Sequence, residues 1–180
     1  MADDQTAPFL VKGPSFLEGV PAKAEIDTFR QQVFNGAALM LFDSWLGKCP
    51  SEGIPNKNDI DPVEFPKLLD RIYMEDWNEE RQQSVLRLAG NFHRYIYGKD
   101  VRGLAVDDHC TGEKNRIFKQ CDQHNFWELC PTFCGYFIDD VNNIYTALTD
   151  LTLPVRDKTA GILTVGLVSP FSSRADSLAC

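Results

Sequence analysis

The sequence predicts an α+β fold, in which a five-stranded antiparallel sheet has short helices over one face and follows a long N-terminal helix. Three observations lead to this prediction. Residues 26–48 have helical apolar spacing, and five later runs have the length and composition of strands. Short helical segments separate the first two strands from the last three. The 180 residues suffice for one domain with a substantial core.

Residues 1–25 show no periodicity and contain several prolines and glycines, so we expect an irregular N-terminal arm. Residues 26–48 then form the predicted long helix, which ends near Gly47. Two apolar stripes lie side by side along it, which leaves two interpretations open. The helix is either buried in its own domain or forms the contact of a homodimer, and we expect the dimer contact. Its predicted residues are Phe29, Val33, Phe34, Ala37, Leu41, Phe42 and Trp45.

The remaining segments form the domain proper, expected at residues 59–170 and followed by a polar tail at 171–180. In chain order they are a strand at 71–77, a strand at 84–90, a short helix at 91–97, a helix at 113–125, and strands at 132–138, 144–155 and 162–169. Polar residues 139–143 and 157–158 are expected to form the turns between the last three strands.

One stretch makes this layout more specific. Arg87-Leu88-Ala89-Gly90 is followed by a short helical segment and then by Gly98-Lys99-Asp100-Val101-Arg102-Gly103. This order resembles the signature of a single-domain PAS family of proteobacteria, R-L-x-G, a short helix, then G-x-D-x-x-G. Residues 59–72 resemble the segment that leads into the first strand of that family. The resemblance covers residues 28–170, with a longer and more aromatic segment than usual at 123–129.

The resemblance implies a PAS-like sensory or regulatory module that signals through its homodimer to a separate effector protein. In such a fold the short helices lie over the sheet and can leave a cavity for a small molecule. Strand alternation and helix phase predict the following lining residues: Leu88, Phe92, Ile96, Phe118, His124, Cys134, Tyr136, Thr149 and Thr164. Tyr136, His124 and the two threonines are the polar groups expected to orient a ligand.

Charge and composition exclude several other classes. The 18 basic and 26 acidic residues give a net charge of −8, which disfavours nucleic acid and anionic membranes as partners. The most apolar run, 37–46, is too short to span a bilayer and contains Asp43. We therefore expect a cytoplasmic protein, in which the six cysteines are reduced.

The sequence contains no nucleophile motif, phosphate-binding loop or dinucleotide-binding glycine pattern, so we expect no enzyme and no catalytic residue. The cofactor is unknown. Cys121 and His124 lie three residues apart on the predicted helix, a spacing that can hold a metal or place His124 against haem, but packing in the core is the favoured interpretation. Two alternatives to the sensor stay open: a ligand-free interaction module with a solid core, and a small acid–base enzyme that uses His124.

Overall fold

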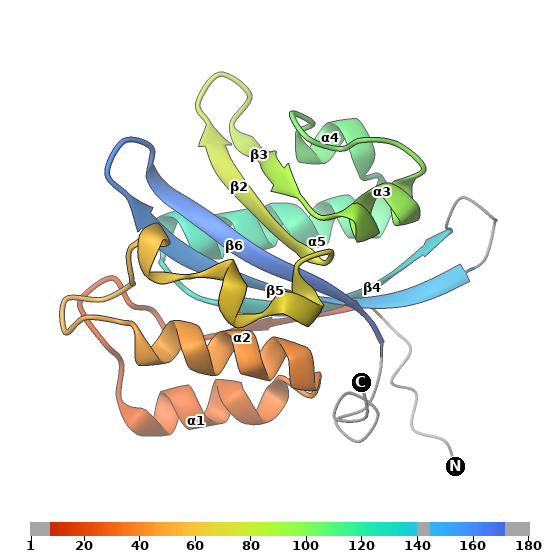
Figure 1. Cartoon of the computed structure of the whole chain (residues 1–180). Coiled ribbons are helices and arrows are strands. Elements are labelled where there is room, and N and C mark those ends of the chain that lie inside the picture. The colour runs from red at the N-terminus through yellow and green to blue at the C-terminus, as the bar shows by residue number, and fades with distance from the viewer. Residues whose placement is uncertain (1–7, 140–144, 172–180) are drawn as a thin grey trace, which may run out of the picture.

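The computed structural model describes residues 8–139 and 145–171. Within these residues the strands form a six-stranded antiparallel sheet in the order β1-β4-β5-β6-β2-β3 (Figure 1). The strands are β1 (Phe9–Lys12), β2 (Ile72–Asn78), β3 (Gln83–Ala89), β4 (Thr132–Asp139), β5 (Tyr145–Asp157) and β6 (Gly161–Pro170). The five predicted strands are present as β2 to β6, and an α+β fold is confirmed.

The helices are α1 (Lys23–Gln32), α2 (Gly36–Gly47), α3 (Asn91–Tyr97), α4 (Val106–His109) and α5 (Gly112–Asp122). Short helical turns complete the chain: η1 (Lys57–Asp59), η2 (Pro62–Glu64), η3 (Pro66–Leu68) and the π-helical η4 (Gln123–Trp127), which continues α5. The short helix predicted at 91–97 is α3. None of the helices in the described ranges has the length and apolar content needed to cross a membrane.

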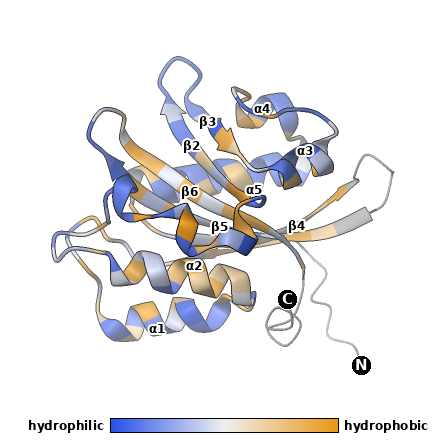
Figure 2. Cartoon of the chain, in the orientation of Figure 1, coloured by the Kyte–Doolittle hydropathy of each residue, from blue (hydrophilic) through white to orange (hydrophobic). Residues whose placement is uncertain are grey.

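Helices cover both faces of the sheet. On one face, α1 and α2 pack with β5 and β6 in the largest apolar cluster, and on the other face α3 and α5 pack against β4 and β5 (Figure 1). Hydropathy follows this layering, because the central strands are apolar and the tip of the β2–β3 hairpin is hydrophilic (Figure 2). The prediction of helices over one face is therefore incomplete, because α1 and α2 cover the other face.

The sixth strand, β1, lies in the segment expected to be an irregular arm. It adds to the edge of the sheet, where Phe9 pairs with Gly135 of β4 and Lys12 pairs with Thr132. Gly135 leaves the space for the Phe9 ring, because a Cβ there would lie 2.2 Å from Phe9 Cε1. A four-residue strand is too short to show alternation in the sequence. Residues 9–12 form a strand because they pair with β4, which is distant in the sequence.

The single long helix predicted at 26–48 is wrong, because the chain breaks at residues 33–35. Val33 adopts φ −78° and ψ 93°, which ends α1. The Asn35 side chain then accepts a hydrogen bond from the Ala38 amide at 3.1 Å and begins α2 as an N-cap. The two helices lie side by side, and Arg30 of α1 donates two hydrogen bonds to the Asp43 carboxylate of α2.

This break also corrects the predicted dimer contact. Folding α1 beside α2 directs most of the apolar stripe into the chain's own core: Phe29, Val33, Leu41, Phe42 and Trp45 are at most 2% exposed. The Trp45 indole also donates a hydrogen bond to the Pro154 carbonyl at 2.9 Å. These five side chains are therefore not available to a second subunit, and the dimer contact predicted through them is wrong.

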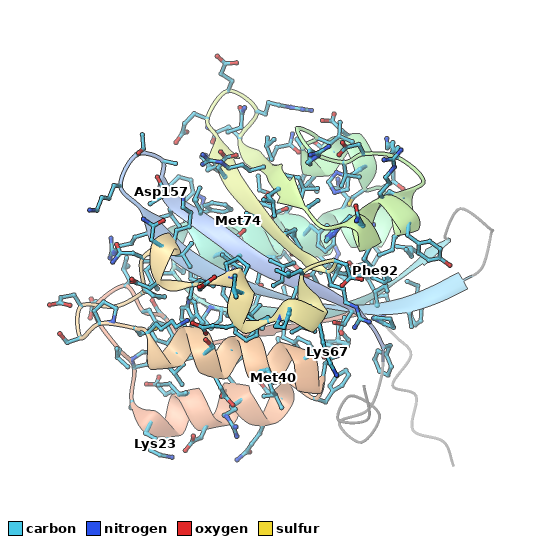
Figure 3. The ribbon with its side chains drawn as sticks, viewed as in Figure 1. Lys23, Met40, Lys67, Met74, Phe92 and Asp157 are labelled. Carbon is cyan, nitrogen blue, oxygen red and sulfur yellow. The ribbon has the colours of Figure 1, made fainter. Side chains whose placement is uncertain are left out.

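Two predicted contact residues, Phe34 and Ala37, are half-buried, and the Phe34 ring packs on Phe133 at 5.1 Å between centroids. The outward side of α2 carries Met40, which is 56% exposed (Figure 3). The homodimer itself stays a prediction.

Candidate functional site

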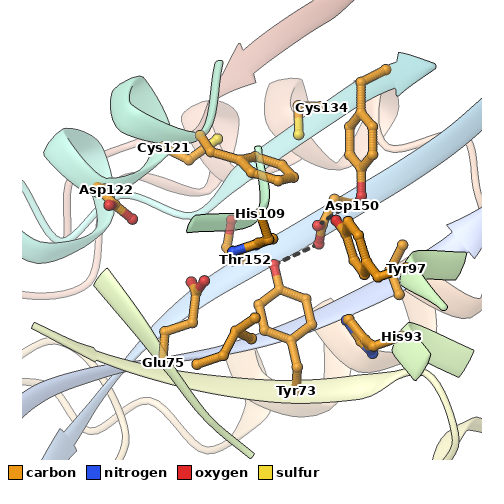
Figure 4. A pocket seen from close by; sticks show the side chains of 14 residues that line it. Tyr73, Glu75, His93, Tyr97, His109, Cys121, Asp122, Cys134, Asp150 and Thr152 are labelled. Carbon is orange, nitrogen blue, oxygen red and sulfur yellow. Dashed lines mark hydrogen bonds between the residues drawn. The ribbon is translucent and has the colours of Figure 1, made fainter. Parts of the chain in front are cut away.

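An interior cavity of about 30 Å³ lies between the sheet and the helices α3, α4 and α5. Such a volume holds one or two water molecules. Its lining residues are Tyr73, Glu75, Leu86, His93, Tyr97, His109, Phe118, Cys121, Asp122, Cys134, Tyr136, Asp150, Thr152 and Val168 (Figure 4). Most of these side chains carry a titratable or hydrogen-bonding group, so the cavity brings several polar groups together in the interior of the domain.

Alternation along the strands selects which residues reach the cavity. Tyr73 and Glu75 come from one face of β2, Cys134 and Tyr136 from β4, and Asp150 and Thr152 from β5. The intervening residues of β5 and β6 point to the opposite face and pack with α1 and α2. Leu86 of β3 and Val168 of β6 also line it, so the cavity depends on strands that are distant in the sequence.

Gly166 of β6 allows Tyr73 to reach the centre of the site. It pairs with Tyr73 across the β2–β6 ladder, and a Cβ at this position would lie 2.0 Å from Tyr73 Cζ. Because Gly166 has no side chain, the Tyr73 ring crosses over β6, and its hydroxyl donates a hydrogen bond to Asp150 Oδ1 at 2.8 Å (Figure 4).

Asp150 is the central acid of the cavity. Its side chain is 4% exposed, and the Tyr136 hydroxyl donates a second hydrogen bond to Oδ2 at 3.4 Å. Burial raises the pKa of Asp150 to about 7, because desolvation disfavours the carboxylate more than the two tyrosines and Lys114 stabilise it. Asp150 is therefore balanced between its neutral and charged forms near neutral pH.

Two further acids line the same space. Glu75 accepts a hydrogen bond from Thr164 Oγ1 at 3.2 Å, and burial followed by repulsion from Asp122 and Asp150 raises its pKa well above the usual range. Asp122 accepts a hydrogen bond from the Ser84 amide at 3.1 Å, and burial raises its pKa to about 6. The three acids therefore favour their protonated forms or a nearby cation.

The nearest cation is Lys114, from the first turn of α5. Its ammonium donates a hydrogen bond to the Tyr97 hydroxyl at 2.6 Å and lies 4.3 Å from the Tyr97 ring centroid. The rings of Tyr136 and Phe118 lie at 5.3 and 5.6 Å from the same nitrogen. Burial lowers the pKa of the Lys114 ammonium, whereas the interaction with the Cys110 thiol and, after it, the charge of Asp150 raise it.

The two histidines of the cavity are held as neutral rings. Burial lowers the pKa of both His93 and His109 to about 4. His93 lies edge-on to Tyr73 at 5.1 Å, and His109 Nδ1 lies 2.8 Å from the Ala105 carbonyl oxygen and packs edge-on to Tyr97 at 5.3 Å. A neutral imidazole supplies a donor and an acceptor without adding charge.

The cavity also has a sulfur side. Cys121 of α5 and Cys134 of β4 both line it, and a hydrogen bond from Cys121 together with burial raises the pKa of the Cys134 thiol well above its usual range. These cysteines are free, as are Cys49, Cys110 and Cys130, while Cys180 lies outside the described residues. The thiols therefore act as weakly polar wall groups.

The structure places Phe118, Cys134 and Tyr136 in the wall of the cavity, as the sequence predicted. Thr164 does not line the cavity; it is fully buried and donates a hydrogen bond to Glu75, which does. Ile96, which is 4% exposed, belongs to the apolar cluster beside the cavity, and Phe92 packs at the edge of that cluster.

Three predicted lining residues lie elsewhere. The pairing of β2 with β3 shifts by one residue between Met74 and Glu75, so Leu88 pairs with Met74 on the opposite face and is 49% exposed. Thr149 has the wrong phase, because its neighbour Asp150 faces the cavity. His124 turns aside in the π-helical turn and contacts Glu128, with 3.1 Å between Nδ1 and Oε1.

The orientation of His124 also separates it from Cys121, its predicted partner for a metal or haem, because only the cysteine lines the cavity. Among residues 8–139 and 145–171, no three histidine, cysteine or acidic side chains are arranged to hold a metal ion. Cys121 and His124 therefore do not face one common space.

Sequence reasoning missed the residues that give the cavity its chemistry, namely Tyr73, Glu75, Asp122, Asp150 and Lys114. One signal was present for Lys114: it precedes Phe118 by four residues and Cys121 by seven, which places all three on one face of a helix. Asp150 gave no signal, because an acidic residue in a strand is normally expected to face solvent. Only the structure shows that helices cover the face of the sheet on which Asp150 lies.

The fold thus combines an antiparallel sheet that is covered on both faces with a small cavity under short helices. Residues 33–167 match the family model of the PAS domain, and the chain belongs to this family. Among curated proteins, none matches the sequence. The family assignment makes the chain a sensory or regulatory module, since PAS domains generally sense rather than catalyse.

Proposed function

We propose that this protein is a PAS-type sensor that binds a small polar molecule in the cavity and signals through its homodimer to a separate effector protein. The observation that carries the proposal is the set of three buried acids that line one space, Asp150, Glu75 and Asp122, with the buried Lys114 ammonium close by. Burying ionisable groups costs free energy, and a solid apolar core would stabilise the domain more. A ligand that satisfies these groups would offset this cost.

The size of the cavity sets a condition on binding. Ligand pockets commonly have volumes of about 300–1,000 Å³, whereas this cavity, at about 30 Å³, has room for water alone. A ligand therefore has to displace side chains on binding. That displacement would also link occupancy to the surrounding helices, as a sensor requires.

The smallness of the cavity supports one alternative, a ligand-free interaction module of the same fold. The two functions differ in what leaves the protein on denaturation. Native mass spectrometry of freshly purified protein, followed by denaturation of the same sample, tests this. A dimer that releases a reproducible small molecule supports the sensor. A protein without extra mass, which also shows no thermal shift across a panel of small polar metabolites, overturns the sensor in favour of the interaction module.

A matched pair of variants locates the binding site. Val168→Leu adds a methylene to a cavity wall residue, whereas Leu88→Met alters an exposed residue outside the cavity. We expect Val168→Leu to reduce the released or bound ligand and Leu88→Met to leave it unchanged. Equal ligand content in both variants would place the ligand elsewhere.

A further inference from the structure

An ammonium group already lies against the aromatic residues of the cavity wall. Lys114 extends from the first turn of α5 and inserts its nitrogen between the rings of Tyr97, Phe118 and Tyr136, at 4.3, 5.6 and 5.3 Å from their centroids. The Tyr97 hydroxyl accepts its hydrogen bond at 2.6 Å. Negative ring faces around a cation are the arrangement that proteins use to bind organic ammonium groups.

The lining itself lacks a compensating cation. Glu75, Asp122 and Asp150 all line the cavity, and the described lining residues include no lysine or arginine. The two lining histidines are neutral, because burial lowers the pKa of each to about 4. Acids therefore exceed cations at this site, even with the Lys114 ammonium at its edge.

Lys114 can leave this position without crossing the core. The residue is half-buried, so its stem reaches solvent while its ammonium points inward. Long lysine side chains readily exchange between such inward and outward positions. Its departure would enlarge the cavity by the space of an aminobutyl group and leave the three rings and Asp150 free to receive a similar group.

We propose that the cavity binds a small primary alkylammonium ion, whose charged head takes the place of the Lys114 ammonium between Tyr97 and Tyr136, within reach of Asp150. This inference rests on the proposed sensory function and names its ligand class. An anion would meet the three acids and the negative ring faces. A neutral ligand could donate a hydrogen bond to an acid but would gain no attraction between opposite charges, so the same wall favours positive charge.

The test uses n-butylammonium as the probe, with n-butanol and butyrate as the neutral and anionic comparators of similar length. Isothermal titration calorimetry at pH 7 compares the three with the full-length wild-type protein. We expect n-butylammonium to bind at least about tenfold more tightly than either comparator, the ratio that one retained charge contact supplies. Equal or tighter binding of butanol or butyrate, or no binding of the amine to any protein tested, would overturn the proposal.

Three variants test the replacement of Lys114. Lys114→Ala removes the competing ammonium and is expected to bind n-butylammonium about tenfold more tightly than wild type. Lys119→Ala is the matched control, because Lys119 lies on the same helix with a side chain that is 48% exposed and paired with Asp107. Its affinity should stay within about twofold of wild type. Asp150→Asn should weaken binding about tenfold.

If circular dichroism shows that Lys114→Ala does not fold, Lys114→Gln replaces it, because glutamine keeps a hydrogen-bond donor for Tyr97 without the charge. If the Lys114 variant that folds binds n-butylammonium with unchanged affinity, the ligand does not take the place of the Lys114 ammonium, and the proposal is refuted. The outcome is separable from the sensory function itself. A released native ligand that has no amino group would overturn this inference and leave the sensor standing, whereas a protein that binds nothing would overturn both.

Discussion

Replacing Asp150 with asparagine removes a carboxyl group from the centre of the cavity and keeps its shape. An asparagine oxygen can still accept the hydrogen bond from the Tyr73 hydroxyl, which lies 2.8 Å from Asp150 Oδ1. The difference between wild type and Asp150→Asn therefore reports mainly the ionisation of Asp150, with a smaller contribution from Glu75, whose pKa the Asp150 charge raises. The remaining acids, Glu75 and Asp122, are present in both proteins.

The expected magnitude follows from the pKa. Burial raises the pKa of Asp150 from its ordinary value of 3.8 to about 7, a difference of about three pH units. Between these two values the unfolded chain has lost this proton while the folded protein retains it. Raising the pH therefore lowers the free energy of unfolding of the wild type, by about 1.4 kcal/mol per pH unit and about 4 kcal/mol in total. Above about pH 7 the loss is complete.

Urea denaturation of both proteins at intervals from pH 4 to pH 8, followed by circular dichroism, measures this difference where unfolding is two-state. We expect the stability of Asp150→Asn relative to wild type to rise by about 4 kcal/mol between pH 4 and 7 and to level off above that range. A difference that does not change with pH would refute the raised pKa and the reasoning from burial.

Three further predictions concern the fold. Phe42→Glu should lower the free energy of unfolding by about 3–5 kcal/mol or more and so unfold the protein, because Phe42 is fully buried. Met40→Glu, on the exposed side of α2, should change stability by less than about 0.5 kcal/mol. Thermal denaturation and light scattering distinguish unfolding from the loss of a dimer. Gly135→Ala should displace Phe9 and cost about 1–3 kcal/mol, with faster amide exchange confined to β1 and β4; unchanged exchange there would contradict the packing at Gly135. Asn35→Ala should cost about 1 kcal/mol in urea denaturation through loss of the α2 N-cap, and a neutral result would mean that the cap contributes nothing.

Elements with strong local signals could be predicted from the sequence. Runs with the length and composition of strands identified β2 to β6, and the segment that ends at Gly98 identified α3. Strand alternation then placed Cys134 and Tyr136 correctly, because β4 is regular along the part that faces the cavity. The expectation for Leu88 was wrong because the shift in pairing between β2 and β3 changes which face the later residues occupy.

The succession of strands and helices along the chain, the acidic charge and the PAS signature could be predicted from the sequence, because each depends only on local spacing and composition. The break at residues 33–35, the addition of β1 and the burial of Asp150 beside Lys114 were decided by the tertiary structure. Each depends on partners that are far away in the sequence. A side chain becomes a buried acid, an edge strand or a core aromatic residue only when another element covers it, and no local pattern encodes that neighbour.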